Sequence, residues 1–247
     1  MGCATMPHGK EISVATPFRH EQKYVAPETV LSVLEERARS VMPIDMHAGV
    51  ENRYQIRSLY LDDVDNSCYW ENEDGTDPRE KFRIRIYNCS PERIMLERKQ
   101  KRHGMCHKVS EPMDLARCQT VMEGNIPAIR QSDGFLMRAF IMRMQSRGLR
   151  PVTIVTYERD PFVWREGNVR ITFDRNIRSS TDFAHFFDPQ LASRPVLRVG
   201  THMLEVKYDE LLPGFLNAML QTTLLRVTSF SKYYLCRRFA LNGIRPA

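Results

Sequence analysis

Polar and hydrophobic residues alternate in the segment REKFRIRIYN, residues 79–88. At the two-residue period of a β-strand, its phenylalanine and isoleucines fall on one face of the strand. The other face carries Lys81, Arg83 and Arg85. Because neighbouring cations repel one another, the pattern predicts that this face meets either open water or a strongly anionic ligand.

The same period of two recurs along the chain and predicts eight strands. They cover residues 18–26, 52–62, 80–88, 93–100, 106–111, 151–164, 168–177 and 202–210. Apolar residues at helical spacing predict helices over residues 27–42, 112–125, 132–147, 211–223 and 229–241. An Asp/Asn/Gly/Pro-rich turn is predicted over residues 63–78, and an irregular segment over residues 178–200.

Most of these strands follow one another in hairpin order, which favours an antiparallel sheet with helices outside it. Eight strands are also enough to close into a barrel. We therefore predict an α+β fold in which helices surround an antiparallel sheet of eight strands, with closure into a barrel left open at this point. No repeat or linker divides the sequence, so a single domain is predicted over residues 16–247, after a flexible leader over residues 1–15.

The charge of the chain favours anionic partners. Its 247 residues include 36 Lys and Arg against 30 Asp and Glu, a formal net charge of +6. Nucleotides, nucleic acid, inorganic phosphates and an acidic membrane surface all fit that sign. None of the six cysteines forms a CxxC pair, which argues against zinc and for reduced thiols in a cytoplasmic protein. No apolar run reaches the roughly 18 residues that a membrane span needs.

Cations dominate the polar faces of most predicted strands. Arg19, Glu21 and Lys23 share the polar face of the first strand, and Glu205 and Lys207 share that of the last. For any one strand, a face open to water explains the pattern. If the sheet closes, however, these faces meet inside, where uncompensated cations are strongly destabilising. The pattern then predicts a water-filled interior that holds a polyanion such as a triphosphate or a phosphate chain.

Eight short motifs in chain order resemble the VTC-type polyphosphate polymerase domain, a member of the triphosphate tunnel (CYTH-like) superfamily. They are RHEQKY, SLYLD, EKFRIRIY, MLERKQK, TYERDPF, VRITFD, LEVKY and SFSKYY, and they span about residues 18–240. The resemblance implies an eight-stranded antiparallel β-barrel (triphosphate tunnel) with surrounding helices. Its inward basic residues would bind the phosphates of ATP and of a growing phosphate chain.

The resemblance also implies roles for individual residues. The implied catalytic residues are Arg83, Arg85, Arg159, Arg170 and Lys207. The implied binders of further phosphates are Lys23, Lys99, Lys108 and Lys232, and the strand pattern adds Lys81. Glu205 would carry a divalent Mn²⁺ or Mg²⁺, with Glu21 as a second candidate ligand.

Several of these roles have structural alternatives. Glu205 could instead form a salt bridge to Lys207 or to another neighbour. Glu21 and Glu97 could orient basic side chains, and Lys232 could lie on a solvated helix face.

Two positions depart from the family pattern. Hydrolases of the superfamily typically begin with two glutamates and a lysine at alternate positions, where this chain has Arg19, Glu21 and Lys23. Loss of the first carboxylate argues against a metal-rich hydrolytic site and for a phosphate-rich one. Ser229 stands where eukaryotic relatives carry an extra lysine, which leaves one expected contact to a terminal phosphate without its cation.

These observations predict an ATP:polyphosphate phosphotransferase that uses Mn²⁺ or Mg²⁺. The alternatives are a tunnel triphosphatase and a polyphosphate- or nucleotide-binding module without turnover. The expected partners are ATP and polyphosphate, with a separate membrane-embedded protein that could receive the chain and bring this cytoplasmic domain to a membrane. Nucleic acid is not expected, because few aromatic residues are interleaved with the cations for base stacking.

Overall fold

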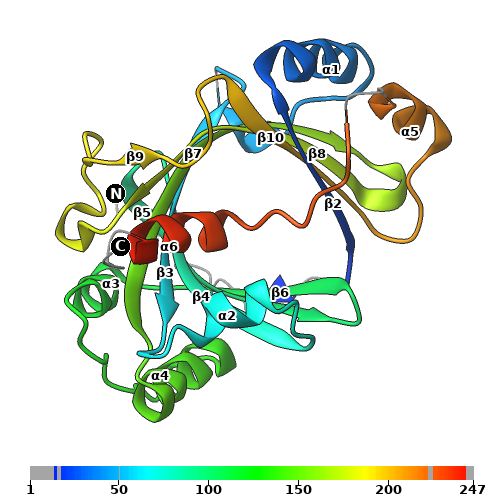
Figure 1. The fold of residues 1–247 in the computed structure, drawn as a ribbon. Helices are drawn as coiled ribbons and strands as arrows, with labels where there is room; N and C mark the ends of the chain where they lie inside the picture. Colours follow the sequence, from blue (N-terminus) through cyan, green and yellow to red (C-terminus); the bar gives the residue numbers. More distant parts are fainter. Residues whose placement is uncertain (1–13, 16–17, 50, 222–224, 243–247) are drawn as a thin grey trace, which may run out of the picture.

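A single antiparallel sheet forms the framework of the computed structural model, which describes residues 14–15, 18–49, 51–221 and 225–242 (Figure 1). The long strands are β2 (His20–Pro27), β3 (Tyr54–Asp62), β4 (Arg79–Tyr87), β5 (Ser90–Arg102), β6 (Met105–Pro112), β7 (Arg150–Trp164), β8 (Val169–Ser180) and β10 (Thr201–Tyr208). Two short strands are β1 (Val14–Ala15) and β9 (Arg194–Pro195). The strand order is β1-β6-β5-β4-β3-β7-β8-β10-β2, with β9 beside β8.

The sheet curls until its two edges meet. β2 pairs with β10 along its length. The chain just before β2 pairs with the opposite edge: β1 is antiparallel to β6, and Arg19 forms a further bridge to Cys106 of β6. One stretch of chain thus joins both edges, and the predicted eight-stranded antiparallel barrel in an α+β fold is confirmed. We call the concave side of this sheet the inner face.

Helices cover the sheet from outside on two sides and cross its inner face at one end (Figure 1). The α-helices are α1 (Glu28–Val41), α2 (Ser67–Glu73), α3 (Leu115–Met122), α4 (Phe135–Arg147), α5 (Gly214–Leu220) and α6 (Lys232–Asn242). Single 3₁₀ turns are η1 (Met46–Ala48), η2 (Glu166–Asn168) and η3 (Phe183–His185).

Two hydrophobic clusters hold the outer helices to the sheet. One joins α3 and α4 to β4 and β5 and includes Ile84, Leu96 and Phe140. The other joins α1 and α5 to β8 and β10 and includes Leu31 and Ile171. Because these clusters bury the outer side chains of the strands, the alternating side chains are left for the inner face. The fold can therefore line its interior with polar groups and still have an apolar core.

Helix α6 lies on the inner face at one end of the barrel (Figure 1). Tyr233 is 2% exposed and packs against Tyr60 of β3, with 5.1 Å between ring centroids. Its hydroxyl donates a hydrogen bond to the buried carboxylate of Asp62. A third hydrophobic cluster forms around these rings. These contacts anchor α6, and they direct its first residue, Lys232, to the interior.

The predicted turn over residues 63–78 contains helix α2, so the prediction is wrong for residues 67–73. Asp62 accepts hydrogen bonds from the backbone N–H groups of Cys68 (2.9 Å) and Tyr69 (3.2 Å). Asp63 accepts one from Ser67 (2.8 Å). A capping carboxylate normally stands directly before its helix. Here the two carboxylates lie at the end of β3, four to seven residues before the N–H groups that they accept. The sequence pattern therefore does not reveal the helix.

The other predicted strands and helices differ from the structure only at their ends, whereas β1 lies in the predicted flexible leader and η3 and β9 lie in the segment predicted to be irregular. α3 begins at Leu115 because the side chain of Asp114 accepts the backbone N–H of Arg117 at 2.9 Å and caps the helix. β8 continues to Ser180, into the segment predicted to be irregular. α6 begins at Lys232, three residues after the predicted start.

Parts of two predictions fall outside the described residues. They are residues 1–13 of the predicted leader and residues 222–223 of the predicted helix whose described part is α5. Within the part of the chain that the structure describes, no helix is both long and apolar enough to cross a membrane.

The packing of α4 can be tested with two phenylalanines of that helix. Phe140 is fully buried, so Phe140→Ala is expected to lower the free energy of unfolding by about 3–5 kcal/mol. Phe135 is 72% exposed, so Phe135→Ala should change it by less than about 0.5 kcal/mol. Urea unfolding followed by circular dichroism measures both, and equal losses would contradict the packing described.

Candidate functional site

The ten cations predicted to bind phosphate lie on the inner face. Nine come from alternate positions of strands β2, β4, β5, β6, β7, β8 and β10, and the tenth, Lys232, comes from the start of α6. The strand register sets some of them directly opposite one another. Lys99 faces both Lys81 and Lys108, and Lys207 faces Arg170. Like charges in opposed positions are destabilising, so this face needs carboxylates to exist.

Glu97 of β5 is the centre of the first cluster, with a side chain that is 2% exposed. It contacts Arg83 Nη2 at 2.6 Å, Lys108 Nζ at 3.1 Å and Arg85 Nη1 at 3.7 Å. Burial alone would raise the pKa of Glu97, but the three cations outweigh it and hold the pKa well below its usual range. Glu97 therefore stays ionised and orients the two arginines, the role that the sequence offered for it.

A second cluster joins β2, β5 and β10 around two carboxylates. Glu21 contacts Lys99 Nζ at 2.7 Å, Lys23 Nζ at 3.1 Å and Lys207 Nζ at 3.4 Å. Glu205 contacts the same Lys207 Nζ at 2.6 Å. Burial opposes ionisation of both carboxylates, but the neighbouring lysines prevail and lower the pKa of each. The alternatives drawn from the sequence are thus present: Glu205 forms a salt bridge to Lys207, and Glu21 orients lysines.

A third cluster surrounds Asp174 of β8, which is fully buried. Arg159 donates two hydrogen bonds to it, at 2.6 and 2.8 Å, and Lys232 Nζ lies 2.7 Å away. The side chain of Lys232 is 10% exposed, so the alternative of a solvated helix face is wrong. The sequence places Asp174 on a polar face but does not reveal its partners, because they come from a neighbouring strand and from α6.

Two tyrosine hydroxyls also orient arginines of the inner face. Arg170 lies 2.7 Å from Asp45 and donates to the hydroxyl of Tyr54 at 2.9 Å. Arg83 donates to the hydroxyl of Tyr60 at 2.8 Å. Sequence reasoning missed Asp45 because it lies between α1 and η1, outside any strand, where a two-residue period carries no information.

Lys81 is the exception among the ten cations. Each of the other nine contacts a carboxylate, whereas no described carboxylate lies within 4 Å of Lys81 Nζ. The ammonium instead donates to Asn72 Oδ1 at 3.1 Å and lies 4.5 Å from the centroid of the Tyr233 ring. Burial, helped by the neighbouring cations Arg79 and Lys99, lowers the pKa of Lys81 to about 7.

An excess of positive charge remains on the inner face. Counted formally, the ten basic side chains exceed by five the five carboxylates that nine of them contact, and the whole chain has a formal charge of +6. The carboxylates are Glu21, Asp45, Glu97, Asp174 and Glu205. Accessibility varies among the ten cations: Lys108 is 37% exposed, Lys99 34% and Arg170 33%, against 8% for Arg159. Such a face can bind a linear polyanion along its lysines while its arginines stay fixed.

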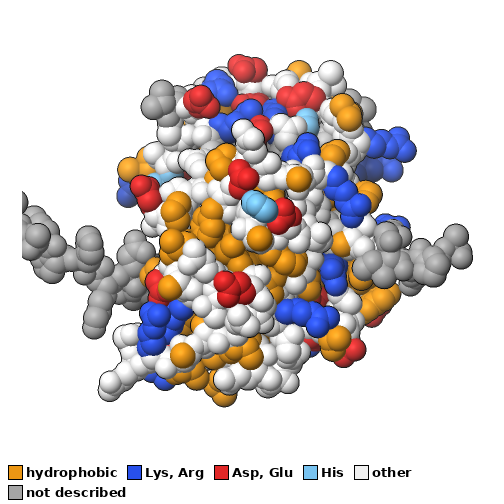
Figure 2. Space-filling model, turned by 90° about the vertical axis from the view of Figure 1, so that its left-hand side faces the viewer, with side chains coloured by type: hydrophobic (Ala, Val, Ile, Leu, Met, Phe, Trp, Pro, Cys, Tyr) orange, Lys and Arg blue, Asp and Glu red, His pale blue; other side chains and the backbone are white. Residues whose placement is uncertain are grey.

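The outer surface has a different character. On the side of the molecule shown in Figure 2, Lys and Arg side chains stand in separate places among hydrophobic and acidic ones. The inner face is where cations are gathered from many strands, so it is the candidate site for an anionic ligand.

Glu21 and Glu205 are the residues that could hold a divalent metal. Among the described residues, no group of three or more His, Cys, Asp or Glu side chains could hold a metal ion without further ligands. Mg²⁺ prefers oxygen ligands and is commonly bound by one or two carboxylates together with substrate phosphates. The two carboxylates that share Lys207 therefore fit a cation that arrives with a phosphate ligand.

The two departures from the family pattern also have structural counterparts. Arg19 Nε lies 2.8 Å from Asp209 Oδ1, so the cation that replaces a glutamate is paired outside the three clusters. Ser229 is exposed in the segment that leads into α6.

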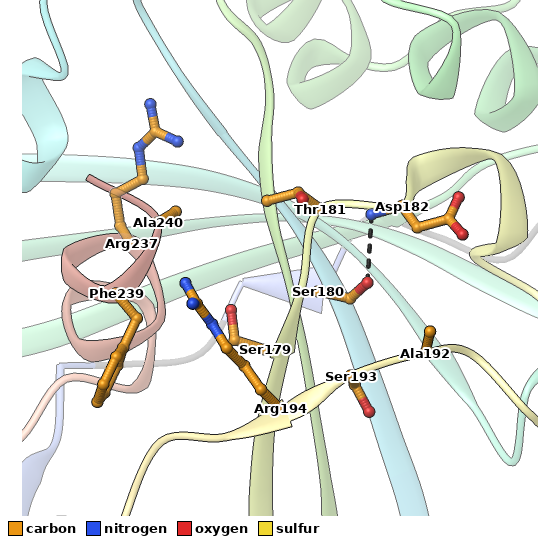
Figure 3. Close-up of a pocket in the computed structure, with 10 residues that line it drawn as sticks. All are labelled: Ser179, Ser180, Thr181, Asp182, Ala192, Ser193, Arg194, Arg237, Phe239 and Ala240. Carbon is orange, nitrogen blue, oxygen red and sulfur yellow. Dashed lines mark hydrogen bonds between the residues drawn. The ribbon is translucent and has the colours of Figure 1, made fainter. Parts of the chain in front are cut away.

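A groove of about 650 Å³ lies beside α6 and contains none of the predicted site residues (Figure 3). Its two guanidinium groups do not converge. Arg237 donates to Asn66 and to the carbonyl oxygen of Val152, and it points away from the other lining residues. Arg194 lies over the ring of Phe239, 5.5 Å from its centroid. The groove is therefore not the candidate site.

Comparison with known proteins identifies a family and a fold. A family model described as the VTC domain matches residues 18–240. The Hippeastrum protein HpAC1, a candidate adenylyl cyclase for which a dominant triphosphatase activity is described, has a similar structure: TM-score 0.54, 14% identity, 90% of this chain and 96% of that chain.

Two other solved structures are less similar. A candidate adenylate cyclase from Bacillus halodurans has a TM-score of 0.46 at 12% identity, with 82% of this chain and 86% of that chain covered. The PH1819 protein from Pyrococcus horikoshii has a TM-score of 0.44 at 13% identity, with 92% and 100% covered. Among curated proteins, none matches the chain by sequence.

The role of Glu97 makes a prediction about stability and pH. Glu97→Gln keeps the shape but leaves three cations without their anion, so it should cost about 3–5 kcal/mol at pH 7. Because the pKa of Glu97 is lowered in the folded state, its contribution is present above its unfolded-state pKa and is lost as the pH falls. The difference between wild type and variant should therefore shrink from about pH 5 downward.

Urea unfolding at pH 7 and at lower pH measures this difference. Glu92→Gln is the matched control, since Glu92 is exposed on the same strand. A cost for Glu97→Gln that stays constant with pH would contradict an ionised, cation-bound Glu97.

Proposed function

The chain belongs to the VTC domain family, and on that basis we propose that it is a polyphosphate polymerase. It would transfer the γ-phosphoryl group of ATP to the end of an inorganic polyphosphate chain. The observation that supports this most is the inner face, where ten cations from seven strands and one helix outnumber the carboxylates that orient them.

The geometry suits phosphoryl transfer in particular. Its transition state is loose, with charge spread over the peripheral oxygens, so positioning and electrostatic stabilisation supply most of the catalysis. Arg83, Arg85 and Arg159 are held by Glu97 and Asp174, which reduces the reorganisation needed when charge develops. A planar guanidinium can contact two phosphate oxygens at once, and it stays charged.

The lysines suit the other requirement of polymerisation, which is to bring two polyanions together. Lys99, Lys108 and Lys207 are partly exposed and come from three strands. Their charges would offset the repulsion between ATP and the acceptor chain. The acceptor is a terminal phosphate that is already anionic near neutral pH, so the proposal needs no dedicated base.

A divalent cation, Mn²⁺ or Mg²⁺, completes the proposal. Glu205, with Glu21 beside it, would hold the cation. When bound, it would neutralise charge on the leaving phosphates of ADP. Lys207 lies between the two carboxylates, and its ammonium would then turn from Glu205 towards a phosphate oxygen.

Two alternatives use the same inner face. If water replaces the acceptor, the site becomes a tunnel triphosphatase, and triphosphatase is the activity described for the Hippeastrum protein of similar fold. If neither acceptor reacts, the protein is a binding module for polyphosphate or nucleotides. Incubation with ATP and Mn²⁺ separates the three: long chains on a gel support the polymerase, free phosphate alone supports the hydrolase, and binding without product supports the module.

The proposal also covers the location of the protein in the cell and a membrane-embedded partner. A polymerase of this kind would act in the cytoplasm and pass its product to a separate membrane-embedded protein. Co-purification with a membrane fraction from the native cell, lost after mild detergent treatment, would support such a partner.

Arg83 gives the most direct test of the inner face. Arg83→Ala removes a fixed guanidinium and is expected to lower polyphosphate synthesis by about 10²-fold, as for loss of one transition-state donor. Triphosphate binding should weaken as well. Arg150→Ala is the control, because Arg150 is exposed at the start of β7. Unchanged synthesis in Arg83→Ala would remove the inner face as the active site.

Glu205 tests the metal. Glu205→Gln is expected to raise the Mn²⁺ concentration needed for half-maximal synthesis by about tenfold or more, with a smaller effect on folding. The exposed Glu210 provides the control Glu210→Gln, which should change neither. If Glu205→Gln unfolds the protein and the residual activity keeps its Mn²⁺ dependence, Glu205 is only the salt-bridge partner of Lys207.

A further inference from the structure

Among the described residues no carboxylate forms an ion pair with Lys81, although it lies on a face where each of the other nine predicted cations has such a partner. Arg83, two residues further along β4, lies 2.6 Å from Glu97 and donates to Tyr60. A phosphate that binds Arg83 must share it with Glu97. A phosphate that reaches Lys81 replaces only a neutral amide and the face of a neutral ring, Asn72 and Tyr233.

The described groups packed around Lys81 attract or repel its charge from a distance, and none of them forms an ion pair with it. They are Asp62 of β3, Cys68 and Glu71 of α2, Arg79 of β4, Lys99 of β5 and Tyr233 of α6. Asp62 already accepts hydrogen bonds from the Tyr233 hydroxyl and from the backbone N–H groups of Asp63, Cys68 and Tyr69.

Of the remaining neighbours, Cys68 and Tyr233 are neutral, Arg79 and Lys99 are positive, and Glu71 is a carboxyl group that forms no ion pair with Lys81 among the described residues. Burial raises the pKa of the Cys68 thiol and of the Tyr233 hydroxyl far above neutrality, so both stay uncharged. Burial also raises the pKa of Glu71. Arg79 and Lys99 oppose a further positive charge. With a pKa of about 7, Lys81 is largely neutral in a slightly alkaline solution.

A half-buried cation without an ion-pair partner is destabilised, and an anion that binds beside it offsets that cost. We propose that Lys81 is the residue on which a phosphate group of the ligand docks, and that it takes up a proton as the phosphate binds. This inference rests on the proposed function, because it takes the ligand of the inner face to be a phosphate chain. It adds that the fold leaves one counter-charge to be supplied by the ligand.

Proton uptake makes the binding depend on pH in a defined direction. Binding favours the protonated form of Lys81, so the affinity should fall as the pH rises above about 7. For one linked proton the fall is at most about tenfold per pH unit. The ligand has proton equilibria of its own, so the effect of Lys81 is the difference between wild type and a variant that cannot lose its charge at that position.

Lys81→Arg is that variant. Calorimetric titration with inorganic triphosphate in EDTA, at pH 8 and in two buffers of different ionisation enthalpy, counts the protons taken up. Wild type should take up between about half a proton and one proton more than Lys81→Arg. Lys81→Arg should still bind, with an affinity that varies less with pH. Lys81→Met should bind at least about tenfold more weakly and lack the extra uptake.

Lys101→Arg is the matched control. Lys101 follows Lys99 at the next alternate position of β5 and is not among the ten cations. This variant should keep the full proton uptake of the wild type. Thermal unfolding at pH 6 should show Lys81→Met at least as stable as wild type, because it removes a half-buried charge that has no ion-pair partner among the described residues.

The outcomes separate this inference from the proposed function. Equal proton uptake by wild type and Lys81→Arg overturns it, as does unchanged affinity in Lys81→Met, and either result leaves the polymerase proposal standing. If wild type does not bind triphosphate at all, the proposed function fails and this inference fails with it. If Lys81→Met does not fold, the difference in proton uptake between wild type and Lys81→Arg still tests whether Lys81 is protonated on binding.

Discussion

Contacts between buried carboxylates and inward cations are the interaction on which this fold depends. Strand alternation brings ten basic side chains to one concave face, and the register sets several directly opposite one another. Glu97, Asp174 and the pair Glu21 and Glu205 divide that charge into small clusters. Without them, closure of the sheet would bring cations together at low dielectric, where repulsion is strongest. The apolar clusters outside the sheet stabilise the barrel but do not remove this constraint.

The same contacts prepare the inner face for a ligand. A carboxylate that fixes two arginines reduces their freedom before any anion arrives, and preorganised charge is more effective than charge that must reorient. The carboxylates are nevertheless too few to neutralise the face. A phosphate chain is the ligand that fits the remainder, since its negative charges are spaced along a line as the cations are. This is the physical link between the architecture and the proposed polymerase activity.

The period-two pattern was enough to predict the strands and the face on which each strand cation lies, and the family resemblance added the closed barrel and Lys232 of α6. It could not identify the partner of each cation, because partners depend on register between strands that are distant in sequence. Asp174 was visible only as a polar residue, and Asp45, in a loop, was not visible at all. Helix α2 was missed because its caps, Asp62 and Asp63, belong to the preceding strand region. That Lys81 differs from Arg83 and Arg85 is equally invisible in REKFRIRIYN, since it follows from what α2 and α6 place beside it.

The way the barrel closes also determines where its wall is weakest. Eight residue pairs join β2 to β10, whereas the described residues give β6 only three pairs with the incoming chain, at Val14, Ala15 and Arg19. Local opening costs less where fewer backbone hydrogen bonds and apolar contacts are broken. Amide hydrogens along this edge should therefore exchange with solvent sooner than those at the centre of β7 and β8. Local opening of the barrel would therefore begin between β6 and the chain before β2, while both outer hydrophobic clusters stay packed.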